Sequence, residues 1–245
     1  MKVVVLGAGG GWPRPRGAAC GYLVQHDGFN LWLDAGTGTM ANLQTHVGIE
    51  DVHAVVISHR HFDHFLDLYP FYLSRWWPSR LDMPPPISLH APPGMFEHAR
   101  QLEETLPKAF RSEVVEPGAA FDVGPFRFQT VETAHPVPTL GMRIEAGGRT
   151  LAYTADTGPC EPMVGLARGS DLLLCEATWL EPPPGASPIH LTASQAAEHA
   201  KRASVGRLVL THVWPAVDPS LAVDRAREIF DGDVLAAVEG MELEP

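Results

Sequence analysis

Short apolar runs rich in β-branched residues alternate along the chain with glycine-containing turns and with segments of helical periodicity. Such runs predict buried strands, whereas the periodic segments predict helices. We expect strands over residues 2–6, 20–25, 30–33, 54–57, 87–90, 140–145, 150–154, 171–175 and 207–210, and a hairpin over 121–131. Helices are expected over residues 41–47, 65–73, 94–106, 192–203 and 220–230, with strain at Pro70 in the second and Thr192 as the N-cap of the fourth. This order predicts an α/β fold with a four-layer αββα sandwich, in one domain over residues 1–245.

The composition narrows the class of protein. Of the 245 residues, 45% are hydrophobic, enough for a sizeable core, and the formal net charge is −11. An acidic surface argues against binding a long nucleic-acid polymer, because phosphate recognition needs basic side chains. The three cysteines are far apart, and we see neither a signal peptide nor an apolar run of membrane-spanning length. We therefore expect a soluble, cytoplasmic protein without a membrane partner.

The most informative stretch is His59-Arg60-His61-Phe62-Asp63-His64, which directly follows the predicted strand over residues 54–57. A strand followed by this turn places three imidazoles and a carboxylate in a small volume. His and Asp together suit Zn²⁺, Mn²⁺ or Fe²⁺. The alternative is a solvated turn that happens to be rich in histidine.

Further candidates recur at the ends of other predicted strands. His135, Asp156 and His212 each follow a strand, and Asp34 ends the strand over residues 30–33. This recurrence indicates a site along one rim of two sheets. Asp34 could orient a metal-bound histidine, or it could cap a helix or a turn.

These motifs, in this order, are similar to those of the metallo-β-lactamase superfamily. The quoted residues are H-R-H-F-D-H, then the lone His135, Asp156 in T-A-D-T and His212 in L-T-H. The resemblance implies a site for two divalent ions, Zn²⁺ in the first place and Mn²⁺ or Fe²⁺ as alternatives. It assigns His59, His61 and His135 to one ion, Asp63, His64 and His212 to the other, and Asp156 to both.

Two further motifs resemble the tRNase Z branch of that superfamily. Cys175-Glu176-Ala177-Thr178 looks like its H-E-A-T loop with Cys in the first place, and His190-Leu191-Thr192 looks like its H-S-T loop with Leu in the second. The resemblance implies phosphodiester chemistry. That branch usually inserts a tRNA-gripping arm between the positions of His135 and Asp156, where this chain has room for one hairpin. The chain is more similar to small bacterial phosphodiesterase-like members, some of which cleave cyclic nucleotides.

The resulting hypothesis is a metal-dependent phosphodiesterase that cleaves a small diester such as a cyclic nucleotide through a metal-bridging hydroxide. In it Asp63 steers the hydroxide, His190 protonates the leaving oxygen or binds a phosphate oxygen, and Glu176 fixes the tautomer of His190. If the motif match is fortuitous, His190 is a surface histidine at a helix N-terminus. The alternative functions are an RNA-processing nuclease, a lactone or thioester hydrolase on the same dinuclear site, and a binding protein that keeps the metals without turnover.

Two segments of the sequence have more than one interpretation. Trp76 and Trp77 lie in a proline- and arginine-rich segment over residues 74–86, which could cover the active site, form a homodimer contact or pack at the domain edge. The glycine-rich residues 7–11 do not match a dinucleotide fingerprint, because Trp12 stands where the third glycine is required. They predict either a turn that brings the backbone close to the metal site or a plain tight turn.

Overall fold

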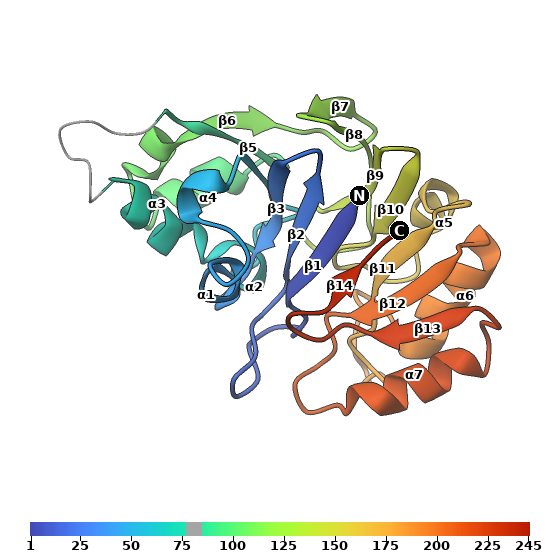
Figure 1. Ribbon diagram of the computed structural model, residues 1–245. Helices are drawn as coiled ribbons and strands as arrows, with labels where there is room; N and C mark the ends of the chain where they lie inside the picture. The colour runs from blue at the N-terminus through green and yellow to red at the C-terminus, as the bar shows by residue number, and fades with distance from the viewer. Residues whose placement is uncertain (77–84) are drawn as a thin grey trace.

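Two mixed β-sheets form the centre of the molecule in the computed structural model, which describes residues 1–76 and 85–245 (Figure 1). In the described residues the first sheet has the order β14 (Glu242–Leu243), β1 (Lys2–Gly7), β2 (Gly21–His26), β3 (Phe29–Ala35), β4 (Ala54–Val56), β5 (Ile87–Ala91) and β6 (Phe110–Val114). The second has the order β13 (Asp233–Ala236), β12 (Arg207–Thr211), β11 (Leu172–Glu176), β10 (Arg149–Tyr153), β9 (Leu140–Ala146), β8 (Phe126–Glu132) and β7 (Ala120–Val123).

The strands β1, β4 and β11 are apolar at almost every position because both of their faces are covered. In β1 the side chains of Val3 and Val5 join the core between the sheets, whereas Val4 and Leu6 join the core beneath the helices. Successive side chains of a strand point to opposite faces, so a strand buried on both sides has no polar face. This explains why the apolar runs in the sequence predict the strands without an alternating pattern.

Helices cover the outer face of each sheet and complete the αββα sandwich, which confirms the predicted fold class (Figure 1). The first sheet is covered by α1 (Thr39–Leu43), α2 (Phe62–Phe65), α3 (Leu68–Trp76) and α4 (Met95–Arg100), with 3₁₀ turns η1 (Ile49–Asp51) and η2 (Leu106–Ala109). The second is covered by α5 (Glu161–Leu166), α6 (Ala193–Ala203) and α7 (Pro219–Arg227). None of the helices in the described part of the chain has the length and apolarity needed to cross a membrane.

The direction of the strands decides where a site can form. From β3 to β6, and from β10 to β13, neighbouring strands run parallel, whereas the remaining pairs are antiparallel. Parallel strands end at the same edge of a sheet, and ligands in such sheets bind outside these carboxyl ends. The predicted site residues lie at or after the carboxyl ends of β3, β4, β8, β10, β11 and β12. Strand β8 runs in the same direction as β10, because both pair antiparallel with β9, so these residues meet at one edge.

The structure corrects several predicted elements. The helix expected over residues 65–73 is two helices, α2 and α3, and Pro70 lies in the first turn of α3, where a missing N–H costs little. Trp76 ends α3 and stacks on Tyr72 at 6.1 Å between ring centroids, so it does not belong to a loop. Trp77 lies outside the described residues, and its proposed roles stay predictions. Strands β6, β13 and β14 and helix α5 were not predicted, because each is short and little patterned.

Candidate metal centre

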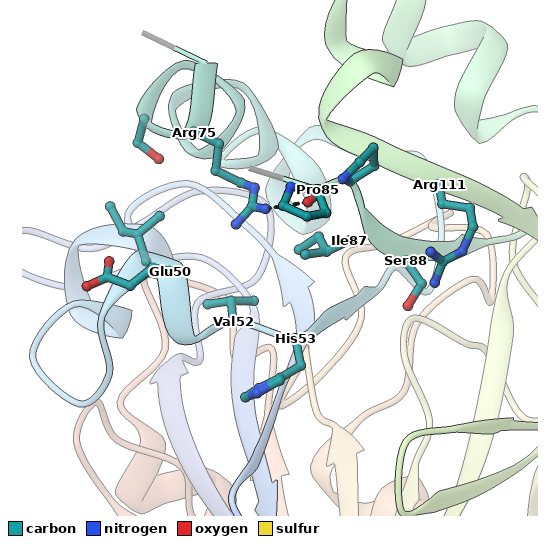
Figure 2. A pocket seen from close by; sticks show the side chains of 11 residues that line it. Glu50, Val52, His53, Arg75, Pro85, Ile87, Ser88 and Arg111 are labelled. Carbon is teal, nitrogen blue, oxygen red and sulfur yellow. Dashed lines mark hydrogen bonds between the residues drawn. The ribbon is translucent and has the colours of Figure 1, made fainter. Parts of the chain in front are cut away.

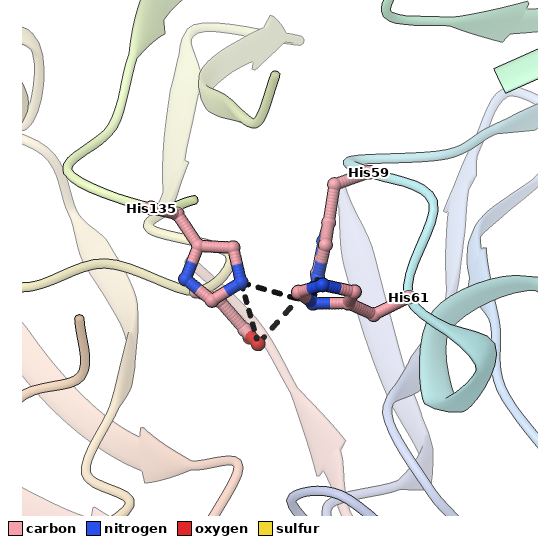
Figure 3. A group of neighbouring side chains, drawn as sticks. His59, His61 and His135 are labelled. Carbon is pink, nitrogen blue, oxygen red and sulfur yellow. Dashed lines mark hydrogen bonds and ion pairs between the residues drawn. The ribbon is translucent and has the colours of Figure 1, made fainter. Parts of the chain in front are cut away.

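Three imidazoles from two parts of the chain converge on one point (Figure 3). His59 and His61 follow β4, and His135 follows β8. Nδ1 of His61 lies 3.1 Å from Nε2 of His59 and 3.0 Å from Nε2 of His135. A neutral imidazole has one N–H and one lone pair, so three ring nitrogens this close would be stabilised by a shared cation that accepts their lone pairs.

A second group lies beside the first. It consists of Asp63 and His64 from α2 and of His212 from the end of β12. The Oδ2 atom of Asp63 lies 3.2 Å from Nε2 of His212 and 3.6 Å from Nε2 of His64. One carboxylate and two imidazoles are again a ligand set that suits a divalent transition metal.

Asp156 lies between the two groups and directs one oxygen toward each. Its Oδ1 atom is 3.2 Å from Nε2 of His64 and 3.2 Å from Nε2 of His212, whereas Oδ2 is 3.5 Å from Nε2 of His59. Oδ1 of Asp156 and Nε2 of His64 are both buried without a hydrogen-bond partner. Buried polar atoms without partners are costly. Divalent cations held by these atoms would satisfy them, so the residues present fit a metal centre.

The other nitrogen of four of these rings is held by a neighbouring oxygen. Nδ1 of His64 donates to Asp34 at 2.8 Å, and Nδ1 of His135 donates to the carbonyl of Ile189 at 3.1 Å. Nδ1 of His59 lies 3.0 Å from Ser58 Oγ, and Nδ1 of His212 lies 2.9 Å from Thr178 Oγ1. These hydrogen bonds occupy Nδ1 and leave each Nε2 facing the cluster.

Asp34 lies beneath the cluster and is completely buried. Besides His64, it accepts hydrogen bonds from the backbone N–H and hydroxyl of Ser58 and, at 2.7 Å, from the hydroxyl of Tyr153. Its backbone has φ 55°, and Ala155 and His212 also have positive φ, at 50° and 51°. Such strain in non-glycine residues is held in place only by strong surroundings and is frequent at functional sites.

The electrostatics separate the two groups. Burial lowers the pKa of His61 to about 4 and that of His135 to about 3, because desolvation disfavours the cation. Burial would also lower the pKa of His212, but the carboxylates of Asp156 and Asp63 raise it to about 9. The first group is therefore neutral and ready to bind a cation at neutral pH. Binding at the second group displaces a proton from His212, so its affinity rises with pH.

Glu176 and His190 form a pair at the edge of the cluster. Nδ1 of His190 donates to Oε1 of Glu176 at 2.9 Å. The same carboxylate is buried and accepts hydrogen bonds from the backbone N–H groups of Thr157, at 2.6 Å, and Leu191, at 3.1 Å. A ligand atom of His190 lies within 4.8 Å of ligand atoms of Asp156 and His212, so His190 could act as an acid or as a further ligand.

The glycine-rich turn approaches the cluster, in agreement with the first of its two interpretations. The N–H of Gly11 donates to Oδ2 of Asp63 at 2.8 Å. A Cβ atom at Gly10 would lie 2.6 Å from the carbonyl oxygen of His212 and 2.7 Å from its Nδ1. Only glycine permits this close approach.

Some residues of the site were not predicted. Thr178 donates its hydroxyl hydrogen to Oε2 of Glu176 at 2.7 Å and contacts His212, so it couples the acid pair to the ligands. It belongs to the C-E-A-T motif, which was a signal that could have found it. Ser58 and Tyr153 act through Asp34, and no pattern in the sequence marks them.

A well-formed cavity lies apart from this centre. It has a volume of about 560 Å³ and lies between η1, the end of α3 and β5 (Figure 2). Arg75 reaches across it and donates to the carbonyl of Pro85 at 2.8 Å. None of the candidate ligands lines it.

The sandwich and the His/Asp cluster at its strand ends define a metallo-β-lactamase-fold hydrolase with a metal-binding site. Residues 13–213 match the family described as a beta-lactamase superfamily domain, and the chain belongs to that family. It is 31% identical to the probable metallo-hydrolase YhfI of Bacillus subtilis, over 98% of both chains. The crystal structure of YhfI superposes with a TM-score of 0.91, at 29% identity, and covers 100% of this chain and 99% of that one. The chain is also 30% identical to a ribonuclease Z of Mycolicibacterium gilvum, over 98% of this chain and 96% of the relative.

Proposed function

We propose that the protein is a phosphodiesterase that cleaves a small phosphodiester, such as a cyclic nucleotide, with two divalent ions, Zn²⁺ in the first place. His59, His61 and His135 would hold one ion, Asp63, His64 and His212 the other, and Asp156 both. When bound, the ions would supply a nucleophile at neutral pH and positive charge for the phosphoryl oxygens. Mn²⁺ and Fe²⁺ suit the same ligands.

The observation that carries the proposal is the pair of Glu176 and His190. The 2.9 Å hydrogen bond leaves Nδ1 of His190 occupied, so Nε2 is the atom that exchanges a proton with the substrate. An alkoxide that leaves phosphorus needs a proton, and an imidazole titrates near neutral pH. Because Glu176 is itself held by two backbone N–H groups, it fixes the ring of His190 beside the cluster.

The chain's own residues divide the remaining work. Asp63, held by the N–H of Gly11, accepts the proton of the attacking water. The carboxylate of Asp156, buried beside three imidazoles, has a pKa well below its usual range and stays ionised. Positive charge directed at the phosphoryl group stabilises the transition state, where negative charge develops.

The size of the proposed substrate follows from what separates His135 from Asp156. The chain forms there only the hairpin of β9 and β10, turned at Gly147 and Gly148. The chain as a whole carries a net charge of −11. Both observations favour a small diester over an RNA. The ribonuclease Z relative favours RNA cleavage as the second candidate.

The test is a substrate comparison on protein loaded separately with Zn²⁺, Mn²⁺ and Fe²⁺. We expect hydrolysis of bis-p-nitrophenyl phosphate and of cyclic AMP, and little cleavage of a precursor tRNA or a lactone. Cleavage of the precursor tRNA alone would establish the nuclease instead. Activity on the lactone alone would leave Glu176 and His190 without a role and would overturn the proposal. Metal binding without turnover on any substrate would favour a binding protein.

A further inference from the structure

Three tryptophans that are far apart in the sequence meet beside the metal centre. The rings of Trp12 and Trp214 are in edge contact, with centroids 4.5 Å apart and an interplanar angle of 73°. The ring of Trp179 lies 4.8 Å from that of Trp214. On its other side Trp179 lies 6.4 Å from the ring of His190. The three rings thus form a continuous aromatic row that ends at the candidate acid.

Each tryptophan is tied to the site by its neighbour in the chain. Trp12 follows Gly11, whose N–H donates to Asp63. Trp179 follows Thr178, which contacts both Glu176 and His212. Trp214 comes two residues after His212. The three rings thus come from segments that also carry residues of the metal centre.

The row is held firmly and is exposed at its outer end. The backbone N–H of Trp214 donates to the carbonyl of Thr178 at 3.2 Å, and the guanidinium of Arg14 donates to the carbonyl of Trp214 at 3.3 Å. Trp179 and Trp214 are half-buried, whereas Trp12 is 48% exposed. An exposed, rigid indole at the rim of a site offers a flat surface for another ring.

One other large aromatic side chain among the described residues is similarly exposed. Phe62 has an exposed fraction of 56%, and its ring stacks on His98 with centroids 5.8 Å apart. Its ring also lies 6.0 Å from that of Phe65, whereas Trp179 of the row contacts His190. Because the leaving group of a diester must lie next to the acid that protonates it, the tryptophan row is the better placed of the two.

We infer that Trp12, with Trp214 and Trp179 behind it, stacks on the heterocyclic base of a nucleoside phosphate whose phosphate lies at the metal centre. The inference rests on the proposed function, which supplies the phosphate anchor, and it deepens it by naming a nucleoside as the organic part of the substrate. Stacking of a base on an aromatic side chain is a frequent source of affinity that needs no base-specific hydrogen bond.

The test compares two ligands with the same phosphate, AMP and ribose 5-phosphate, by calorimetry on the metal-loaded protein. The variants are Trp12→Ala, Trp12→Phe and Phe62→Ala, with Leu73→Ala as the matched control because Leu73 is also 48% exposed and lies on α3. We expect Trp12→Ala to raise the Kd of AMP about tenfold and to leave that of ribose 5-phosphate unchanged. Trp12→Phe should retain part of the preference for AMP, and Leu73→Ala all of it.

Three results would overturn the inference. In the first, the wild type binds both ligands equally or binds neither. In the second, Trp12→Ala weakens the binding of both ligands to the same extent. In the third, the preference for AMP is lost in Phe62→Ala and kept in Trp12→Ala. Hydrolysis of bis-p-nitrophenyl phosphate by the wild type is measured in parallel. If that hydrolysis is absent while AMP binding depends on Trp12, the proposed function fails and the base site stands. If Trp12→Ala instead hydrolyses cyclic AMP normally and with an unchanged KM, the proposed function stands and the base site fails.

Discussion

The floor of the metal centre and its rim are built in different ways. In the floor the side chains of His59, His64 and Asp34 are completely buried, and every one is held by at least one neighbour from another strand end. At the rim His190 has a side-chain exposure of 16% and Trp12 is half-exposed. The floor is fixed by many coupled contacts, whereas the rim has fewer contacts and meets the solvent.

This difference indicates at which positions metal binding and catalysis can be altered separately. A buried polar group that loses its partner costs more than the lost hydrogen bond, because the remaining group stays desolvated. Changes in the floor should therefore remove metal and stability together. Changes at the rim should alter turnover or substrate affinity while metal content and fold are retained. Four variants test this distinction between floor and rim.

The largest effect is expected for Asp156→Ala. Asp156 faces both groups of imidazoles, so its loss should strip at least one metal ion and lower kcat by roughly a thousandfold or more. Metal content by plasma emission spectroscopy after dialysis, together with the hydrolysis of bis-p-nitrophenyl phosphate, measures this. Asp122→Ala removes an exposed carboxylate on β7 and should change neither quantity. A fully loaded Asp156→Ala protein would contradict the bridging role.

The next effect is expected for His190→Ala. Loss of a general acid should lower kcat about 10²- to 10⁴-fold while metal content and the thermal midpoint stay within error. His46→Ala, at an exposed position shortly after α1, serves as the control. If His190→Ala loses metal, His190 is a ligand or a structural residue, and the distinction between floor and rim is wrong at this position.

A smaller effect is expected for Asp34→Asn, which keeps the size of the side chain and changes its hydrogen bonding. The amide cannot accept from Ser58, Tyr153 and His64 all at once, so His64 should lose its fixed orientation. We expect metal affinity to fall about 10- to 100-fold. Titration against a chelating dye measures this. Tyr153→Phe removes one of the contacts of Asp34 and should have a lesser effect in the same direction, and an equal or greater effect would speak against this order.

The smallest effect is expected for Thr192→Ala. Thr192 caps α6 by a capping box with Gln195, and it lies two residues after His190. Its loss should cost about 1 kcal/mol in the free energy of unfolding and should loosen the loop that carries His190. Asp218→Ala removes the cap of α7 and gives a matched loss of stability away from that loop. Chemical denaturation and kcat are compared. We expect kcat to fall in Thr192→Ala and to stay unchanged in Asp218→Ala. Equal values of kcat in the two variants would show that the cap does not position His190.

Much of the fold was predictable because a buried strand corresponds to a local run of apolar residues in the sequence. The apolar runs at residues 2–6, 54–57 and 171–175 became β1, β4 and β11, within a residue or two at each end. Short elements at the surface were harder to predict from the sequence. The helix α5 and the strands β6, β13 and β14 have only two to six residues each, too few for a clear pattern, and their structure comes from what they pack against.

The candidate site divides in the same way. The turn from His59 to His64 is a local motif, because a strand and a turn alone place its side chains together. His135, Asp156 and His212 are single residues at the ends of separate strands, and the sequence could connect them only by the order in which they resemble a known family. The sheet brings them together, because β8, β10 and β12 run in the same direction and therefore end at the same edge.

The sequence by itself determined the buried strands, the types of ligand available and the order in which they occur. The tertiary structure decided which nitrogen of His64, His135 and His212 faces the cluster, because the oxygens that hold these rings come from elsewhere in the chain, on Asp34, Ile189 and Thr178. It also decided that Asp156 directs one oxygen to each group and that Trp12, Trp179 and Trp214 form one row. Orientation and long-range contact depend on the packing of the two sheets, and no local pattern encodes them.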